Sequence, residues 1–363
     1  MAITIRDVAR KLNLSITTVS RALDGYGDVS EETRQRVIAT AHEMGYTPNR
    51  AARQLRRRRS DAIGYILPAS TSCFSDPFYS EFIAGLGDEA TKHDLDLLIS
   101  SAAPESEAEH QIYEHWTHGR KVDGLVLNRM RLSDWRVQYL SKNNFPFVTQ
   151  ERSVDAVDYA SVEVDGCYWF RRLVEHLTSL GHRRIAYIGA APELKIQADR
   201  YQGYQDALNA ANLELVPARI MKGDMTAEGG YQSARLLFAL PDAPTAIACI
   251  DDMTAIGVMH AAHDHGLVVG QDLAVTGYDG INGFEHTQPP LTTVNQPIYQ
   301  IARQLVQMLA TLITQGSLVE KKVRVQPVLE IRASTAMTNV RHPSKQINSA
   351  KDDVLEIKME GNC

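Results

Sequence analysis

Residues 4–23 read TIRDVARKLNLSITTVSRAL, and this stretch decides the fold of the amino-terminal part of the chain. Apolar residues recur at helical spacing on both sides of Asn13, which predicts two short amphipathic helices joined by a tight turn. Thr4, three residues before Asp7, is typical of a capping box, and Ser15 is placed to cap the second helix. Asn13 tolerates the left-handed backbone that the turn requires. The stretch predicts a helix-turn-helix, although ordinary helical bundles also contain such pairs.

A third helix is expected directly afterwards. Ser30 is placed to cap it, and Glu31 and Glu32 fall in its first turn, where the helix dipole favours anions. Gly45 ends the pattern. Three short helices with one pair in helix-turn-helix geometry form a unit whose second helix enters the DNA major groove.

The charge of the chain is unevenly distributed. Residues 1–60 hold twelve basic and six acidic residues, out of 38 and 44 in the whole chain, so the remainder holds 26 and 38. The first segment therefore carries a charge of +6 and the rest −12. A basic head on an acidic body indicates a nucleic-acid-binding module attached to a part that does not bind nucleic acid.

The segments TIRDVARKLNLSITTVSRAL and VSEETRQRVIATAHEMGYTPNRAARQL resemble the amino-terminal domain and hinge of the LacI/GalR family of bacterial transcription regulators. The resemblance implies that Ile16, Thr17 and Arg21 face base edges, whereas Ser15, Thr18 and Ser20 serve phosphates or caps. The residues expected at the DNA are Thr4, Ser15, Ile16, Thr17, Thr18, Ser20, Arg21, Asn49, Arg50, Arg53 and Leu55.

The hinge follows at residues 49–60. Pro48 disfavours helix at the residue before it, and Asn49 can cap a short helix over 50–56. Seven residues form a marginal helix alone in water. We therefore expect the hinge to be a disordered basic linker in the absence of DNA and to form a helix when the protein binds DNA. The resemblance implies that Leu55 then wedges between base steps in the minor groove, and that Arg53 holds a phosphate.

After residue 60 the sequence alternates between strand and helix patterns, which predicts doubly wound parallel sheets. The pattern stops and restarts, so we expect two such halves facing each other across a ligand cleft. Strands are expected at 62–67, 95–100, 122–127, 146–149, 184–189, 219–222, 245–250 and 273–277, and helices near 79–93, 108–118, 133–142, 166–180, 201–211, 227–240 and 253–265.

This second region also resembles the family, as the periplasmic-binding-protein-like effector domain that follows the hinge. The matching segments include AIGYILP, DPFYSEFIAG, HLTSLGHRRIAYIG, DRYQGYQDAL, PTAIACIDDMTAIGVMHAA, LAVTGYDG and PPLTTVNQP. The resemblance implies an α/β, two-lobed domain and is strongest to the sugar-responsive members. FIAG and GDMTAEGGY are similar to members that handle α-glucosides.

Candidate effector contacts follow from the rule that open α/β sheets bind ligands beyond the carboxyl ends of their strands. Asp279 closes an expected strand, and its carboxylate can accept two hydrogen bonds from a vicinal diol. Arg200 would offer a fork of donors from the start of its helix, and Phe78 beside Asp76 could stack on an apolar sugar face. Each could instead be purely structural: a turn residue, a surface residue, a core ring and a helix cap, respectively.

The resemblance adds Glu151 and Arg152, at the first crossover, to the expected effector site. Two further positions depart from the family pattern. Asp251 stands where asparagine is usual, so it only accepts hydrogen bonds when ionised. Met225 stands where many members stack an aromatic ring, and its thioether still packs an apolar face. These departures bear on the identity of the effector rather than on the class of protein.

The length of 363 residues allows two or three domains, and 44% apolar with 23% charged residues is ordinary for a soluble protein. No apolar run approaches the roughly 20 residues that span a membrane, and the amino terminus does not read as a signal peptide, so we expect a cytoplasmic protein. The four cysteines lack metal or redox spacing. The expected domains are 1–48 for the helix-turn-helix, 49–60 for the hinge, 61–336 for the effector-binding and dimerisation domain, and 337–363 for a polar, flexible tail.

Enzyme motifs for phosphate cradles, zinc proteases or nucleophile elbows are absent from the sequence, so we expect no catalytic residue, cofactor or metal. His110, His115 and His118 lie on one expected helix, but their spacing does not suit a zinc site. The sequence predicts a homodimeric, sugar-responsive repressor acting on a palindromic operator. Apolar residues in the tail at spacings of three and four leave a tetramer as a less favoured option. The pattern is also compatible with a purine-type corepressor-dependent repressor, a sugar-binding receptor or an architectural DNA binder without allosteric control.

We expect Leu55→Ala to weaken operator binding much more than nonspecific DNA binding. The substitution removes the minor-groove wedge but leaves the phosphate contacts, which carry nonspecific affinity. Fluorescence anisotropy with operator and scrambled duplexes measures both affinities. Equal weakening on the two duplexes would contradict the wedge.

Overall fold

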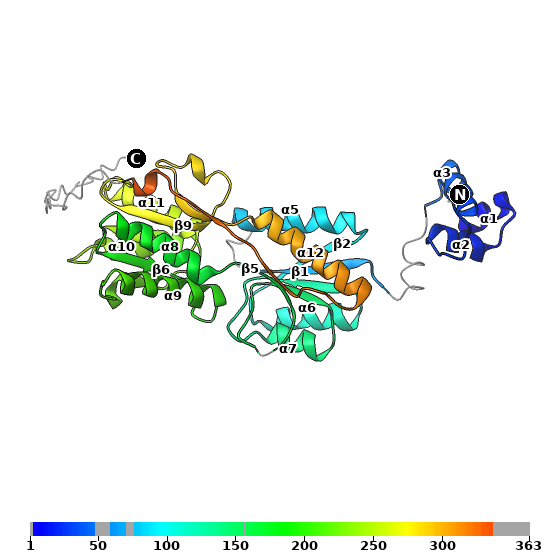
Figure 1. The fold of residues 1–363 in the computed structure, drawn as a ribbon, viewed down its shortest axis with the longest axis horizontal. Coiled ribbons are helices and arrows are strands. Elements are labelled where there is room, and N and C mark those ends of the chain that lie inside the picture. The colour runs from blue at the N-terminus through cyan, green and yellow to red at the C-terminus, as the bar shows by residue number, and fades with distance from the viewer. Residues whose placement is uncertain (1–2, 48–58, 70–75, 156, 337–363) are drawn as a thin grey trace, which may run out of the picture.

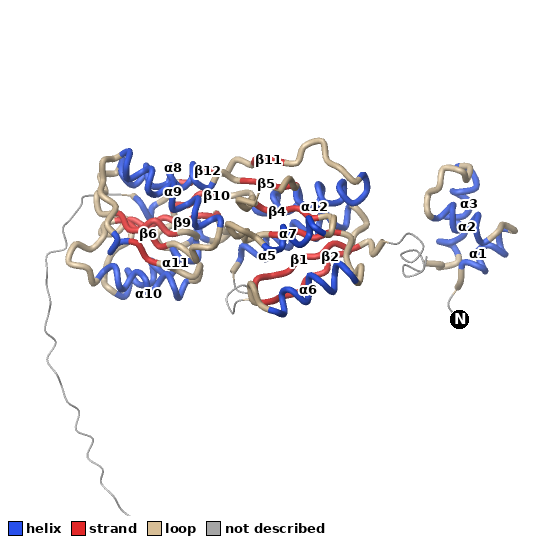
Figure 2. Tube along the Cα trace, turned by 90° about the horizontal axis from the view of Figure 1, so that it is seen from below, coloured by secondary structure: helices blue, strands red, loops and turns tan. Residues whose placement is uncertain are grey.

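The computed structural model describes residues 3–47, 59–69, 76–155 and 157–336. The expected hinge helix and the tail from 337 onwards lie outside these ranges. The described chain forms an N-terminal helical domain and two α/β lobes, which lie side by side in both views (Figures 1 and 2). The predicted fold class is confirmed.

The N-terminal domain consists of α1 (Ile5–Leu12), α2 (Ile16–Leu23) and α3 (Glu31–Glu43). Its helices enclose a small apolar core of Val8, Ala9, Val19, Ala22, Val37 and Ala41.

Local signals fix the ends of these helices. Asn13 ends α1 with a φ of 55°, the left-handed conformation expected for the turn. The Asp7 carboxylate accepts the Thr4 backbone N–H at 3.0 Å and its hydroxyl at 2.7 Å, and these bonds lower the pKa of Asp7. The Ser15 hydroxyl accepts the N–H of Thr18 at 3.0 Å. The helix-turn-helix prediction is therefore confirmed at the level of its turn and caps.

The first lobe is built on a parallel six-stranded sheet in the order β11-β5-β4-β3-β1-β2. Helices α5 and α12 pack on one face, and α6 and α7 on the other. The central strand β1 is buried along almost its whole length, as a strand covered on both faces must be. The bounds are β1 (Ala62–Pro68), α5 (Pro77–Lys92), β2 (Asp96–Ala102), α6 (Glu107–His118), β3 (Gly124–Leu127), α7 (Trp135–Lys142), β4 (Phe147–Gln150), β5 (Ala160–Glu163), α12 (Ile298–Gln315) and β11 (Lys322–Arg324).

The second lobe repeats this plan with the sheet order β12-β10-β9-β8-β6-β7, in which only β12 is antiparallel. Helices α8 and α9 cover one face, and α10 and α11 the other. The bounds are α8 (Gly166–Ser179), β6 (Ile185–Ile188), α9 (Lys195–Ala210), β7 (Ile220–Met221), α10 (Ala227–Phe238), β8 (Ala246–Cys249), α11 (Asp252–Asp264), β9 (Ala274–Asp279), β10 (Thr292–Asn295) and β12 (Val328–Glu330), with short 3₁₀ turns at Pro217–Arg219, Phe284–His286 and Ala333–Thr335.

The chain passes between the lobes three times, after β5, after β10 and after β11. As a result, α12 and β11 belong to the first lobe although the second lobe precedes them in sequence, and α12 lies beside α5 in Figure 1. The sequence pattern places no element on β5, β10, α12, β11 or β12. Every strand and helix that it does predict in the two lobes is present, with ends shifted by a few residues. The largest shift is in α9, which begins at Lys195 instead of residue 201.

Within the described residues, no helix combines the length and apolar character needed to cross a membrane.

Helices α10 and α11 cross closely because each presents a glycine to the backbone of the other. A Cβ on Gly257 would lie 1.8 Å from the carbonyl oxygen of Ala227, and one on Gly230 would lie 2.2 Å from that of Thr254. Gly87 on α5, by contrast, has open space around it.

We expect Gly257→Ala to lower the free energy of unfolding by about 2 kcal/mol or more, because the two backbones must separate to admit the methyl group. Gly87→Ala is the matched control. It should raise stability by about 0.5–1 kcal/mol, since alanine is the better helix former. Urea unfolding monitored by circular dichroism measures both. A neutral Gly257→Ala would contradict the close crossing.

Candidate effector cleft and nucleic-acid interface

The carboxyl ends of the strands in both lobes open into one cleft. The first lobe contributes residues at or just after the ends of β1, β3 and β4, and the second lobe contributes residues that follow β6 and β7 and the last residue of β9. Parallel sheets place their ligand sites at this edge. The cleft holds two compartments, which we call the inner and the outer compartment.

The inner compartment is a cavity of about 20 Å³, close to the space that one or two water molecules occupy. It contains four of the expected effector residues together with four that were not expected. Its lining residues are Phe78, Arg129, Gln150, Glu151, Ile196, Arg200, Asp279 and Gln296.

Arg200 and Asp279 form the core of the inner compartment. The guanidinium of Arg200 lies 3.7 Å above the Tyr278 ring, donates to the carbonyl of Ile250, and places Nη2 3.4 Å from the Asp279 carboxylate. Gln296 donates to the same carboxylate oxygen of Asp279 at 2.7 Å. The side chains of Arg200 and Asp279 are 5% exposed. Contrary to the sequence prediction, Arg200 lies in the second turn of α9 and not at its start.

Burial sets the protonation of the carboxyl groups here. Loss of hydration raises the pKa of Asp279 to about 6, against the opposing charge of Arg200. The same cause raises the pKa of Glu151 to about 7, again opposed by Arg200 and reinforced by Asp199. Both groups therefore titrate near neutral pH.

Asp251 and Asp252 follow β8 and have different partners. Asp251, an expected effector contact, is buried, caps α11 by accepting the N–H of Thr254 at 2.8 Å, and lines neither compartment. Asp252 accepts the N–H groups of Gly280 and Ile281, each at 2.8 Å, and thereby fixes the loop after Asp279. Burial, and next the charge of Asp279, raise the pKa of Asp252 well above its usual value. Asp252 was not among the site residues expected from the sequence. Its position directly after Asp251 in the motif ACIDDM was the feature of the sequence that could have indicated it.

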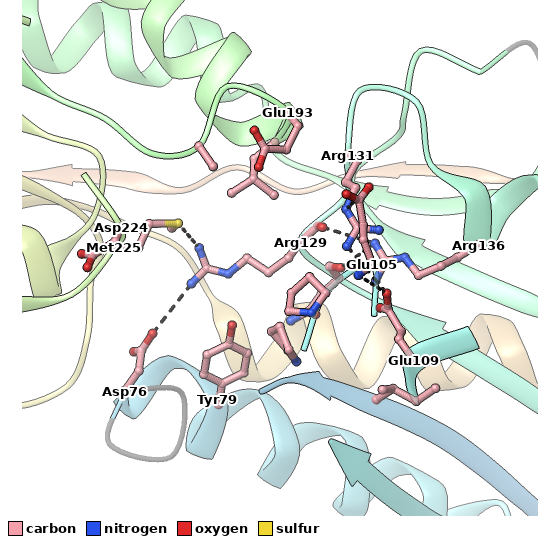
Figure 3. A pocket seen from close by; sticks show the side chains of 16 residues that line it. Asp76, Tyr79, Glu105, Glu109, Arg129, Arg131, Arg136, Glu193, Asp224 and Met225 are labelled. Atoms are coloured by element: carbon pink, nitrogen blue, oxygen red, sulfur yellow. Dashed lines mark hydrogen bonds and ion pairs between the residues drawn. The ribbon is translucent and has the colours of Figure 1, made fainter. Parts of the chain in front are cut away.

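The outer compartment is a cavity of about 260 Å³, and Figure 3 shows the side chains that line it. It shares Arg129 with the inner compartment and is bounded by Glu109 of α6 and by Leu194, directly before α9. Asp76 and Met225, both expected, line it. Asp76 also caps α5 by accepting the N–H of Phe78 at 3.0 Å, and burial raises its pKa. The remaining lining residues are Ile66, Pro68, Tyr79, Pro104, Glu105, Glu109, Asn128, Arg129, Arg131, Arg136, Ala191, Glu193, Leu194 and Asp224.

Arg129 lines both compartments and was missed by the sequence analysis. Its guanidinium lies 3.7 Å from the Asp76 carboxylate and donates to the sulfur of Met225, in the opposite lobe, at 2.7 Å. Figure 3 shows its side chain reaching across the cleft between these two partners. Arg129 lies just after β3, so the strand-end rule could have found it.

Arg152, which was also expected at the effector site, contacts the segment between β4 and β5. Its guanidinium donates to the carbonyls of Tyr159 and Val157 at 2.6 and 2.7 Å and lies 4.2 Å from the centre of the Tyr159 ring. It lines neither compartment. Arg152 therefore has its partners within the segment between β4 and β5, apart from both compartments.

Backbone hydrogen bonds join the two lobes beside the outer compartment. The N–H of Leu132 donates to the carbonyl of Glu193, and that of Lys195 donates to Met130, both at 2.8 Å. Arg131 and Leu194 thus form an isolated antiparallel bridge. The lobes are held together at this side of the cleft.

The second helix of the N-terminal domain presents an accessible face. Ile16, Thr17 and Arg21 are exposed, and 45% of the Ile16 surface is accessible. Arg21 pairs with Asp28 at 2.9 Å and lies over the ring of Tyr26. Thr4 and Ser15 serve as helix caps, and Thr18 and Ser20 are partly buried on the same helix. The other residues expected at the DNA, Asn49, Arg50, Arg53 and Leu55, lie outside the described residues.

In the part of the chain that the structure describes, no three His, Cys, Asp or Glu side chains are arranged to hold a metal ion. His110 stacks on Trp135 with the ring centres 3.8 Å apart.

The chain matches two family models. Residues 4–49 match the lacI family of bacterial regulatory proteins, and residues 174–335 match the periplasmic binding protein-like domain. The HTH-type transcriptional regulator AglR of Rhizobium meliloti (strain 1021) is 33% identical over 359 residues, which cover 96% of this chain and 100% of that protein.

Solved structures agree with these matches. The lac repressor dimer bound to operator and the anti-inducer ONPF is 28% identical with a TM-score of 0.79, covering 92% of this chain and 99% of that one. The complex of the transcriptional regulator CelR with cellobiose is also 28% identical, with a TM-score of 0.70 and the same coverage.

We expect Glu151→Gln to change how stability depends on pH. The folded-state pKa of about 7 lies above the ordinary value of 4.5, so between these values the folded protein holds the proton more tightly than the unfolded chain. The free energy of unfolding should fall as pH rises through this range, by about 1–3 kcal/mol, and the variant should lack this loss.

Urea unfolding at pH values from about 5 to 8 measures the effect. Glu114→Gln, which changes an exposed carboxylate on α6, is the matched control. If the profiles of wild type and Glu151→Gln run parallel, the burial of Glu151 does not govern its protonation.

Proposed function

The chain belongs to the lacI family of bacterial regulatory proteins, and on that premise we propose that it is a cytoplasmic homodimeric repressor that releases a palindromic operator when a small sugar enters the interlobe cleft. The observation that carries the proposal is the pairing of Arg200 with Asp279 in a buried cleft, on a chain whose second helix is exposed. Members of this family are DNA-binding transcriptional regulators and not enzymes.

The chemistry of the inner compartment supports a polyhydroxylated ligand. A carboxylate accepts hydrogen bonds from neighbouring hydroxyls, while a guanidinium donates to their oxygens. The first lobe adds Glu151, and Phe78 offers an apolar ring face. The complex of CelR with cellobiose, a protein similar to this one, supports a sugar as the class of effector.

The charge and geometry of the head support DNA binding. The basic first segment attracts phosphates, and Ile16, Thr17 and Arg21 lie on the exposed side of the second helix. Two heads bind two half-sites, so a symmetric dimer and a palindrome go together. The lac repressor dimer bound to operator, to which this chain is similar, supports that arrangement.

The proposed mechanism is thermodynamic linkage between the cleft and the hinge. The three crossovers let the lobes change their relative position, and the first lobe carries the chain that leads from the hinge into β1. A sugar that binds one lobe arrangement more tightly than the other lowers operator affinity by its differential affinity for the two states. The hinge helices over 49–60 would then fold only in the arrangement that DNA selects.

The test begins with selection of a palindrome from a half-site-randomised library by the full-length protein. Anisotropy with the recovered palindrome is then measured with and without glucose, trehalose, maltose and sucrose. We expect one of these sugars to release the operator. If none of these sugars changes the operator affinity, the sugar-responsive repressor is the wrong function. If the protein instead leaves the operator only when a purine is removed, the alternative of a corepressor-dependent repressor is favoured.

We expect Asp279→Asn to bind the recovered palindrome but to need at least about tenfold more sugar for release, since it removes a charge-assisted acceptor from the cleft. Asp272→Asn, which changes an exposed carboxylate of the second lobe that lines neither compartment, is the control. Release of the Asp279→Asn variant at the wild-type sugar concentration would remove Asp279 from the effector site.

A further inference from the structure

We propose that the effector is an uncharged glycoside of at least two rings that spans both compartments, and that Arg129 contacts the junction of the rings and selects for this length. The inference rests on the proposed function, because it names the class of sugar that enters the cleft.

The first argument is the distribution of space. The residues that best suit a sugar hydroxyl, Arg200 and Asp279, line a compartment of about 20 Å³, whereas the adjoining outer compartment has about 260 Å³. The outer value approaches the roughly 300 Å³ at which sites for drug-sized ligands begin. A ligand that places one edge against Arg200 must therefore have most of its volume beyond Arg129, in the outer compartment.

The second argument is the position of Arg129. It lies just beyond the end of β3 with a φ of 49° and contacts Met225 of the other lobe, whose φ is 63°. Positive φ values at two non-glycine residues that meet across a cleft indicate a backbone held there by its surroundings. Because Arg129 lines both compartments, its guanidinium stands where two parts of a spanning ligand join.

The third argument is the hydrogen bonding of Arg129. Its guanidinium donates to a thioether sulfur, a weak acceptor, and its ion-pair partner Asp76 lies at 3.7 Å, beyond a normal hydrogen bond. Ring centres of Phe78 and Tyr79 lie 5.4 and 5.7 Å away. An ether or hydroxyl oxygen of a ligand would be a better acceptor than the sulfur that Arg129 contacts.

The fourth argument is charge. Among the described residues, three arginines and five carboxylates line the outer compartment. Arg131 already pairs with Glu105 and Glu109 at 3.3 and 3.7 Å, and Arg136 with Asp134 at 2.6 Å. The carboxylates left over outnumber Arg129 in this described lining, so a phosphate or a sugar acid would meet repulsion, while hydroxyl donors find acceptors. The carboxylates are Asp76, Glu105, Glu109, Glu193 and Asp224.

The lining of the outer compartment also disfavours a nucleoside. Tyr79 is the aromatic residue among its described lining residues, and the Arg129 guanidinium already lies over that ring. A flat base would find no free pair of aromatic faces in this described lining. Pro68, Pro104 and Ile66 offer instead the small apolar surfaces that suit the faces of a sugar ring.

The test uses calorimetry with the full-length protein and defined probes: glucose, maltose, trehalose, sucrose, cellobiose, glucose 6-phosphate and cytidine. We expect at least one disaccharide to bind about tenfold or more tightly than glucose, and glucose 6-phosphate to bind no better than glucose. Arg129→Asn should reduce the ratio of disaccharide to glucose affinity by about tenfold, since asparagine tolerates positive φ but does not reach the junction.

Arg120→Asn is the matched control, because Arg120 has a φ of 51° and is exposed. It should leave the affinity ratio unchanged. Thermal unfolding shows whether Arg129→Asn is folded. If it is not, Arg129→Lys replaces it in the test; this variant keeps a cation at the site and should retain part of the ratio of disaccharide to glucose affinity.

The proposal would be overturned if glucose, glucose 6-phosphate or cytidine bound as tightly as every disaccharide. It would also be overturned if Arg129→Asn lost the same factor of affinity for glucose as for the disaccharide. Operator release distinguishes failure of the two-ring effector from failure of the proposed function. Release by glucose alone would overturn the two-ring effector and leave the proposed function standing, whereas no release by any sugar would overturn both.

Discussion

Carboxylates can be buried in the interlobe cleft because two arginines lie there with them. Two strand ends and the start of α5 bring Asp279, Glu151 and Asp76 out of water, and an uncompensated buried charge is costly. Arg200 from the second lobe and Arg129 from the first supply the compensation, but each is imperfect in geometry. The pKa values of Asp279 and Glu151 remain raised in consequence. The cleft therefore holds incompletely compensated polar groups that the hydroxyls of a ligand can satisfy.

The same cleft is where the two lobes meet. Their sheets share no strand among the described residues, and three crossovers and a backbone bridge between 130–132 and 193–195 connect them near the ligand space. Arg129 reaches from one lobe to Met225 in the other, so ligand contacts and the lobe arrangement involve the same side chain. This coincidence is what an effector-controlled DNA binder requires, because a ligand shifts an equilibrium only through contacts that differ between the two states.

The sequence determined the features that depend on local spacing. The caps at Thr4 and Ser15 and the left-handed Asn13 needed only neighbours three or four residues away, and they were confirmed. The alternation of strands and helices likewise predicted most elements of both lobes. The strand-end rule, together with the family resemblance, also predicted six residues that line the cleft, because both can be applied to the sequence alone. These residues are Asp76, Phe78, Glu151, Arg200, Met225 and Asp279.

Tertiary structure alone decided the features that join distant parts of the chain. Gln296 reaches Asp279 only because β10 pairs with β9, and α12 returns to the first lobe through a crossover that no periodicity reveals. Even within one segment, Arg152 follows the expected ligand residue Glu151 but turns to the carbonyls of Val157 and Tyr159, a choice of partner that the spacing of residues does not reveal. Arg129 stands between two compartments because the lobes face each other. Spacing along the chain records which residue types occur near a strand end, whereas the partner of each side chain depends on which strands and lobes come together in space.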